Sequence, residues 1–154
     1  MAAYYADSSA LVKRHVPEIG SAWFTSLADP SSGNVVITAR ISLAEIYSAL
    51  NRRVREASIT PADYISIISD LNHLWSTDYE IVELTQPVVD ETRLLCERHP
   101  LRAYDAVQLA SALHAQRILP SLGLSALVFI SADDRLLVAA QAEGLVTDNP
   151  NLHP

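Results

Sequence analysis

The sequence begins with a short β-rich run that ends in an aspartate and two serines, Tyr4-Tyr5-Ala6-Asp7-Ser8-Ser9. A second run of the same kind, Val128-Phe129-Ile130-Ser131-Ala132-Asp133-Asp134, lies towards the other end of the chain. In an open parallel sheet, ligands bind in the crevice at the carboxyl ends of the strands. If both runs are strands of one such sheet, Asp7 and Asp133 face each other at that crevice.

Between and beside these runs, β-rich segments alternate with segments long enough for helices. Strands are predicted at Ala3 to Ala6, Val35 to Thr38, Tyr79 to Leu84, Leu127 to Ser131 and Leu145 to Thr147. The alternation predicts an α/β fold of three layers, with a central, mainly parallel sheet flanked by helices. The length of 154 residues suits a single domain over residues 1–154.

Several helices carry recognisable signals. Thr60-Pro61-Ala62-Asp63 combines an N-cap residue, a proline at the first helical position and an acid in the first turn, and Gly144 suits the end of the last helix. Apolar residues recur at helical spacing within residues 40–57 and 103–119, which gives both predicted helices an inward face.

The composition excludes several classes of protein. There are 11 Lys and Arg residues against 18 Asp and Glu, a net charge of -7, so a simple basic coat for nucleic acid or lipid is absent. The four glycines allow neither a dinucleotide fingerprint nor a P-loop, and the five histidines show no zinc-binding spacing. A single cysteine excludes an internal disulfide, and no stretch approaches the ~20 apolar residues of a membrane span, so we expect a cytoplasmic protein with no membrane contact.

Carboxylates are the remaining candidates for chemistry. A third acid, Asp105, lies at the border of the buried stripe of its predicted helix, where it needs a partner. Carboxylates that lie close together repel, and a divalent cation with oxygen ligands, above all Mg²⁺, relieves this repulsion. Purely structural roles are the alternative for the same residues. Asp7 and Asp133 can cap helices, and Asp105 can be a first-turn acid that the helix dipole stabilises. Glu45 lies opposite the apolar stripe of its helix, which predicts a solvated face.

Four motifs in order resemble the PIN-domain family, and most of all its VapC-type toxins of toxin-antitoxin pairs. The motifs are Tyr5-Ala6-Asp7-Ser8-Ser9-Ala10-Leu11, Ile41-Ser42-Leu43-Ala44-Glu45-Ile46-Tyr47-Ser48-Ala49-Leu50, Leu101-Arg102-Ala103-Tyr104-Asp105-Ala106-Val107-Gln108-Leu109-Ala110 and Phe129-Ile130-Ser131-Ala132-Asp133. The likeness runs from about Tyr4 to Gly144. Ser8 and Ser131 stand where threonine is common in the family, a change that keeps the hydroxyl.

The resemblance implies a PIN-like fold and a Mg²⁺-dependent endoribonuclease toxin, with Mn²⁺ as a substitute ion. It implies that Asp7 and Asp105 bind the metal, that Asp133 is a ligand or holds water, and that Glu45 is a second-site ligand or orients the attacking water. Ser9 and Ser131 would support these acids, while Asp134 and Asp148 rank lower. Candidate RNA contacts are Lys13, Arg14, Arg102 and Arg135, together with Arg52, Arg53 and Arg55.

The resemblance also implies protein partners: a second copy in a homodimer, and a cognate antitoxin that lies in a groove formed by the helix pair of residues 40–75. Two alternatives stay open. A catalytically silent PIN-like binding module would tolerate replacement of the acids, and a phosphoacceptor receiver-like signalling domain would place a lysine at a late strand end, whereas the only lysine is Lys13.

Overall fold

Five parallel strands form the centre of the computed structural model, which describes residues 1–124 and 126–154. The strand order is β3-β2-β1-β4-β5, and every neighbouring pair is parallel. The strands are β1 (Ala3–Ala6), β2 (Val35–Ala39), β3 (Tyr79–Val82), β4 (Leu127–Ile130) and β5 (Val146–Asp148). All five carboxyl ends therefore lie along one edge, and β1 and β4, which carry the two aspartate motifs, are neighbours at the centre.

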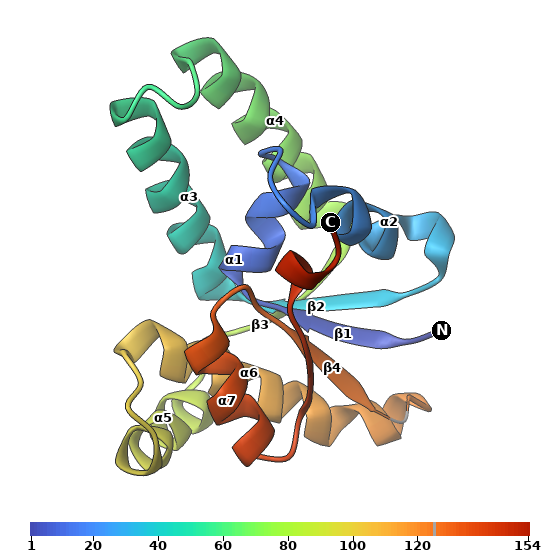
Figure 1. Ribbon diagram of the computed structural model, residues 1–154. Coiled ribbons are helices and arrows are strands. Elements are labelled where there is room, and N and C mark those ends of the chain that lie inside the picture. The colour runs from blue at the N-terminus through green and yellow to red at the C-terminus, as the bar shows by residue number, and fades with distance from the viewer. Residues whose placement is uncertain (125) are drawn as a thin grey trace.

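Helices cover both faces of the sheet and complete three layers (Figure 1). One face carries α1 (Ser8–Leu11), α2 (Ser21–Ala28), α3 (Arg40–Arg55) and α4 (Pro61–Thr77), and the other carries α5 (Gln86–Arg98), α6 (Ala103–Ile118) and α7 (Asp134–Ala142). Short 3₁₀ turns are η1 (Val12–Arg14), η2 (Pro30–Ser32), η3 (Leu119–Leu122) and η4 (Pro150–Leu152). The predicted three-layer α/β fold is confirmed.

Each face of the sheet has its own hydrophobic core, because side chains alternate along a strand. Phe24, Leu50 and Leu71 belong to the core beneath α1 to α4, while Leu109 and Phe129 belong to the core beneath α5 to α7. α3 and α4 extend away from the sheet and are joined at their far ends, so the pair projects from the body of the molecule (Figure 1).

The predicted strands agree with the structure to within a few residues. The first matches residue for residue, whereas the third ends at Val82 instead of Leu84. Val82 lies opposite Ala39, the last residue of its neighbour β2, so Glu83 and Leu84 have no strand to pair with. Ser131 likewise falls outside β4, and the last strand is shifted by one residue.

The helix signals are confirmed as well. At the start of α4, Thr60 Oγ1 accepts a hydrogen bond from the Asp63 amide at 3.0 Å, and the Thr60 amide donates to Asp63 Oδ2 at 2.8 Å. Gly144 follows α7 with a φ of +89°, in the left-handed region that glycine tolerates best. Within residues 1–124 and 126–154, no helix combines the length and the apolar character that a bilayer span requires.

Candidate active site

Asp7 lies immediately after the central strand β1 and caps the short helix α1. Its Oδ1 accepts hydrogen bonds from the Ala10 amide at 3.0 Å and from Ser9 Oγ at 2.6 Å, and its Oδ2 accepts one from Ser131 Oγ at 2.6 Å. Burial raises the pKa of this carboxyl, and the hydrogen bonds from Ser131 and Ser9 oppose that rise. Asp7 is therefore both a helix cap and a buried acid that three donors hold in one orientation.

The loop that follows β4 is tied to Asp7 by two serine hydroxyls. Ser131 Oγ, besides donating to Asp7, accepts a hydrogen bond from the Asp133 amide at 3.0 Å. Ser9 Oγ accepts one from the Ala132 amide at 2.9 Å. The two sequence motifs that end in an aspartate thus meet at the centre of the sheet edge, with Ser9 and Ser131 between them.

Glu45 departs from the solvated position that its helical pattern predicts. The side chain is partly buried, and Gln108 Nε2 of α6 donates to its Oε1 at 2.6 Å. Burial is the largest cause that raises the pKa of Glu45, and the negative charges of Asp7 and Asp105 raise it further. Glu45 on α3 is therefore close enough to Asp7, after β1, and to Asp105, on α6, to be affected by the charge of each.

The remaining acids are placed differently. Asp105, in the first turn of α6, is partly exposed, and its Oδ2 accepts from the Arg102 amide at 3.4 Å. Asp133 caps α7, where its Oδ1 accepts from the amides of Arg135 and Leu136. Its backbone amide is linked to Asp7 through Ser131, whereas its carboxylate bonds to the start of α7. Two further acids bond elsewhere, Asp134 to Asn149 and Asp148 to His153.

Gln108 is a site residue that the sequence reasoning missed. It is 2% exposed, donates to Glu45 and to Ser42 Oγ, and accepts from the Tyr5 hydroxyl at 2.7 Å. These bonds connect the central strand with α3 and α6. The available signal was an amide side chain within an otherwise apolar stretch of helix, where an unpaired polar group is costly.

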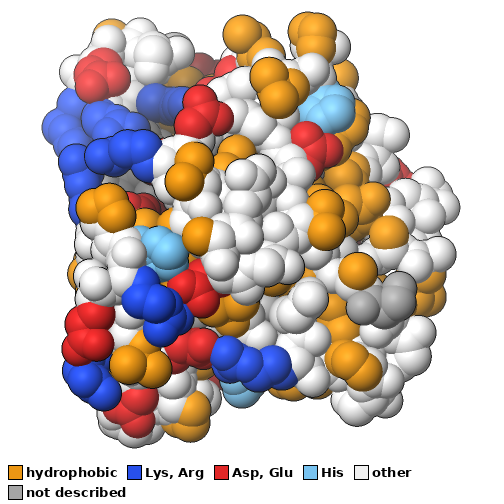
Figure 2. Space-filling view, turned by 60° about the horizontal axis from the view of Figure 1, so that its bottom comes forward, with side chains coloured by type: hydrophobic (Ala, Val, Ile, Leu, Met, Phe, Trp, Pro, Cys, Tyr) orange, Lys and Arg blue, Asp and Glu red, His pale blue; other side chains and the backbone are white. Residues whose placement is uncertain are grey.

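A pocket of 590 Å³ opens beside these acids. One wall comes from α1 and α3, and the other from the start of α6 and the loop after β4. Residues that line it and matter for its chemistry are Ser8, Ser9, Glu45, Arg52, Arg102 and Tyr104. Acidic oxygen atoms and arginine side chains therefore share one cleft. On the face drawn in Figure 2, Lys and Arg side chains gather at the upper left, with acidic side chains next to them.

The acids suit a hard dication in their chemistry. Within the part of the chain that the structure describes, no group of three or more His, Cys, Asp or Glu side chains is positioned so that it could hold a metal ion. Asp7, Glu45 and Asp105 nevertheless offer only oxygen donors, and burial or mutual repulsion raises the pKa of Asp7 and Glu45. A divalent cation relieves the repulsion between carboxylates, and oxygen donors of this kind are those that Mg²⁺ and Mn²⁺ prefer.

A sequence model of the PIN domain matches residues 4–142. The chain belongs to the PIN-domain family. This PIN-domain protein is 31% identical over 150 residues to Ribonuclease VapC45 of Mycobacterium tuberculosis (strain CDC 1551 / Oshkosh), with 97% of each chain covered.

Two solved structures share the PIN fold at low identity. VapBC2 from Rickettsia felis, bound to a DNA fragment from its promoter, matches with a TM-score of 0.62 and 12% identity over 96% of this chain and 98% of that one. FitAB bound to the IR36 DNA fragment matches with a TM-score of 0.64 and 14% identity over 96% and 94%. The predicted resemblance to the PIN-domain family is confirmed.

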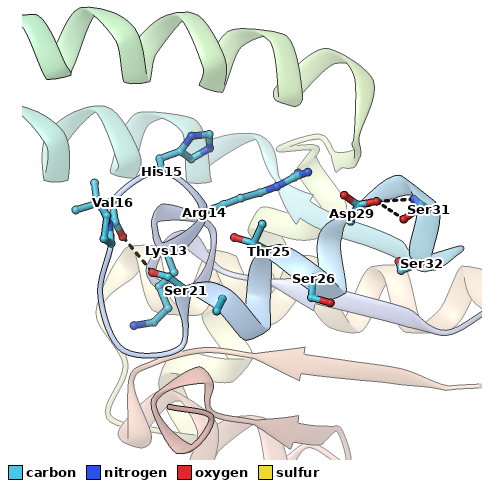
Figure 3. A pocket seen from close by; sticks show the side chains of 12 residues that line it. Lys13, Arg14, His15, Val16, Ser21, Thr25, Ser26, Asp29, Ser31 and Ser32 are labelled. Atoms are coloured by element: carbon cyan, nitrogen blue, oxygen red, sulfur yellow. Dashed lines mark hydrogen bonds between the residues drawn. The ribbon is translucent and has the colours of Figure 1, made fainter.

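Lys13 and Arg14 of this PIN-domain protein lie at a second, larger pocket of 690 Å³ (Figure 3). Lys13 is 4% exposed and its Nζ donates to Glu18, to the Ile19 carbonyl and to Asn151. Arg14 is bound to Asp78 and Tyr79. Because Lys13 and Arg14 are bound to partners within the chain, both have a structural role, and we do not propose them as RNA contacts.

Proposed function

We propose that this PIN-domain protein is the endoribonuclease toxin of a toxin-antitoxin pair and that it hydrolyses RNA phosphodiester bonds with a divalent cation, Mg²⁺ or Mn²⁺. The observation that carries the proposal is the gathering of Asp7, Glu45 and Asp105 beside an arginine-lined pocket at the carboxyl edge of the sheet. The curated relative, named a ribonuclease, supports it because it is similar over almost the whole chain.

Asp7, Glu45 and Asp105 would hold the ion, with Asp133 as a further ligand or a holder of water. When bound, such an ion supplies a deprotonated water and neutralises the charge that develops on the phosphate. Ser9 and Ser131 fix the orientation of Asp7. Gln108 positions Glu45, which in this proposal orients the attacking water from Oε2, because Oε1 accepts the Gln108 amide.

The proposal includes two protein partners. FitAB and VapBC2 have the same fold, which makes an antitoxin a reasonable partner for this chain. We propose that the antitoxin docks on the projecting α3 and α4 pair, where Ile65 is 71% exposed, and blocks the pocket next to it. A homodimer is the second assembly that we propose.

Cleavage of RNA by the purified protein tests the proposal. We expect labelled single-stranded RNA to be cut in Mg²⁺ or Mn²⁺ and to stay intact in EDTA. Asp7→Asn should lower cleavage at least about 100-fold, the order of effect typical of losing a group that acts in the transition state, while the circular dichroism spectrum is retained. Asp134→Asn is the matched control, since an asparagine can still accept the hydrogen bond from Asn149.

Contaminating ribonuclease is the main alternative source of activity. Cleavage that survives Asp7→Asn or EDTA would therefore count against the proposal. A wild-type protein that binds RNA without cutting it in either ion would support the silent binding module instead. Arrest of growth on expression, and its reversal by the cognate antitoxin, tests the toxin role separately.

A further inference from the structure

Tyr104 stands out among the aromatic residues. It is 57% exposed, whereas the other nine Tyr, Trp and Phe side chains are buried or only partly exposed. An exposed aromatic ring forgoes the hydrophobic stabilisation that burial would provide. Tyr104 lines the 590 Å³ pocket together with Glu45. The ring is therefore available to a ligand at the candidate active site.

The position of Tyr104 along the chain ties it to the acids. It directly precedes Asp105 in the first turn of α6 and lies two residues after Arg102, the N-cap of that helix. That turn is anchored by the Asp105 carboxylate, which accepts from the Arg102 amide at 3.4 Å. Tyr104 and Asp105 therefore belong to the same helical turn, and Tyr104 lines the pocket beside Glu45.

The Lys and Arg side chains differ in whether they form ion pairs. Within residues 1–124 and 126–154, most of the eleven Lys and Arg side chains form ion pairs with carboxylates, and Arg52, Arg55 and Arg102 do not. Those in pairs are Lys13, Arg14, Arg40, Arg53, Arg93, Arg98, Arg117 and Arg135. Two of the remaining three, Arg52 and Arg102, line the pocket from its opposite walls, on α3 and before α6.

An unpaired guanidinium on each wall suits two phosphates of one chain, because its planar fork matches phosphate oxygens. An exposed ring beside them suits the face of a base. In a duplex the base faces are covered by their neighbours, so a ring can stack only on an unpaired base. The combination therefore selects a single strand over a helix.

We propose that one unpaired base of the RNA substrate stacks on Tyr104 and that Arg52 and Arg102 bind the phosphates on either side of it. This inference rests on the proposed function and specifies how the same pocket recognises its substrate. Tyr104 contributes affinity for unpaired bases of any identity, since every base has a face on which a ring can stack.

The test measures binding separately from cleavage. All variants are made in the Asp7→Asn background, and the Kd for a fluorescein-labelled single-stranded RNA of 12 nucleotides, roughly the length that a single-strand site of this kind covers, is measured by fluorescence anisotropy in Mg²⁺. We expect Tyr104→Ala to raise the Kd about 5- to 100-fold. Tyr104→Phe keeps the ring and should stay within about twofold, whereas Tyr104→Leu, apolar without a ring, should resemble the alanine variant.

The arginines have their own readout and a matched control. Arg52→Ala and Arg102→Ala should each lower the slope of log K against log salt by about 0.7, the value for one phosphate contact on a single strand. Arg93→Ala removes an exposed arginine of α5, outside the pocket, and should leave the slope unchanged. For a double-stranded RNA of the same sequence, Tyr104→Ala should not change the Kd.

The outcomes separate the two proposals. If the wild type cuts RNA while Tyr104→Ala binds the single strand as tightly as its parent, the stacking inference is overturned and the proposed function stands. An equal loss of affinity for the duplex would also overturn it. If the wild type neither binds nor cuts any RNA in Mg²⁺ or Mn²⁺, the proposed function itself fails.

Discussion

Ser131 is a fully buried hydroxyl that serves two aspartates at once. It donates to Asp7 Oδ2 and accepts from the Asp133 amide, so its removal leaves a carboxylate oxygen and an amide without that partner. A buried polar group left unsatisfied costs about 1–3 kcal/mol. The stability of the molecule therefore depends on the same hydroxyl that orients the candidate site.

Replacement of Ser131 makes this dependence measurable. We expect Ser131→Ala to lower the free energy of unfolding by about 1–3 kcal/mol, as determined by urea denaturation. Ser131→Thr keeps the hydroxyl and should lose less. Equal stability of Ser131→Ala and the wild type would show that the two hydrogen bonds contribute little.

Gly20 is required by space as well as by backbone conformation. Its φ is +82°, and a Cβ at this position would lie 2.2 Å from the carbonyl oxygen of Pro150. We expect Gly20→Ala to reduce the thermal midpoint well beyond the effect of Gly123→Ala. Gly123 has a similar φ of +74° but no atom within 4 Å of a built Cβ, so its substitution should cost only the conformational strain, about 1–2 kcal/mol. Similar losses in the two variants would refute the role of the contact with Pro150.

At the scale of single residues, the sequence predicted the site in part. The link between the first and last motifs follows from the rule for strand ends, since Asp7 and Ser131 directly follow two neighbouring strands. Glu45 could be chosen only by resemblance, because the pattern of one helix does not reveal that α6 packs against its polar face. For the same reason the burial of Lys13 was not predicted: its partner Asn151 lies 138 residues away in sequence.

Among the elements, η1 and the end of α4 are joined by an ion pair that water scarcely reaches. Arg14 Nη2 and Asp78 Oδ2 are 2.8 Å apart, and their side chains are 9% and 8% exposed. Arg14 Nη1 also donates to the Tyr79 hydroxyl at 3.2 Å. The pair holds the first helical turns of the chain against the helix that leads into β3.

Removal of one partner should therefore be severe. We expect Asp78→Ala, which leaves Arg14 buried without its carboxylate, to cost about 3–5 kcal/mol of unfolding free energy. Glu97→Ala breaks an exposed pair with Arg93 on α5 and should change stability by less than about 1 kcal/mol. Urea denaturation of both variants decides the matter, and a comparable small effect in each would mean that the Arg14 pair is not important.

Element boundaries were predicted well where nearby residues determine them and less well where a neighbouring strand determines them. The start of α4 is determined by the residues that cap it, Thr60 and Asp63, and the predicted start is confirmed. The end of β3 depends on where its neighbour β2 ends. The residues after Val82 carry no information about that position. Strand ends in a parallel sheet are a property of pairs of segments that lie far apart in sequence.

For the whole molecule, stability should respond to pH through His15. Burial lowers the pKa of this imidazole, the charge of Arg14 lowers it further, and Asp70 opposes the shift. Its Nε2 is buried and has no hydrogen-bond partner among the described residues. The unfolded chain therefore binds a proton more readily than the folded one.

The sign of the effect follows from linkage. The contribution of neutral His15 to stability is complete above the unfolded pKa of about 6.5 and is lost as the pH falls below that value. We expect the free energy of unfolding to decline less between pH 7 and pH 5 in His15→Gln than in the wild type. Asp7 and Glu45, whose pKa values are raised, act in the opposite direction in both proteins, so the difference between the two curves isolates His15. Parallel curves would contradict the expectation.

The hydrogen bond between Asp7 and Ser131 joins residues that are 124 positions apart. During translation, Asp7, Glu45 and Asp105 are therefore synthesised before the hydroxyl that orients the first of them. A chain that ends before β4 lacks Ser131 and also Ala132, which lines the pocket. In the proposed role, RNA meets the complete site only after synthesis has passed Ser131.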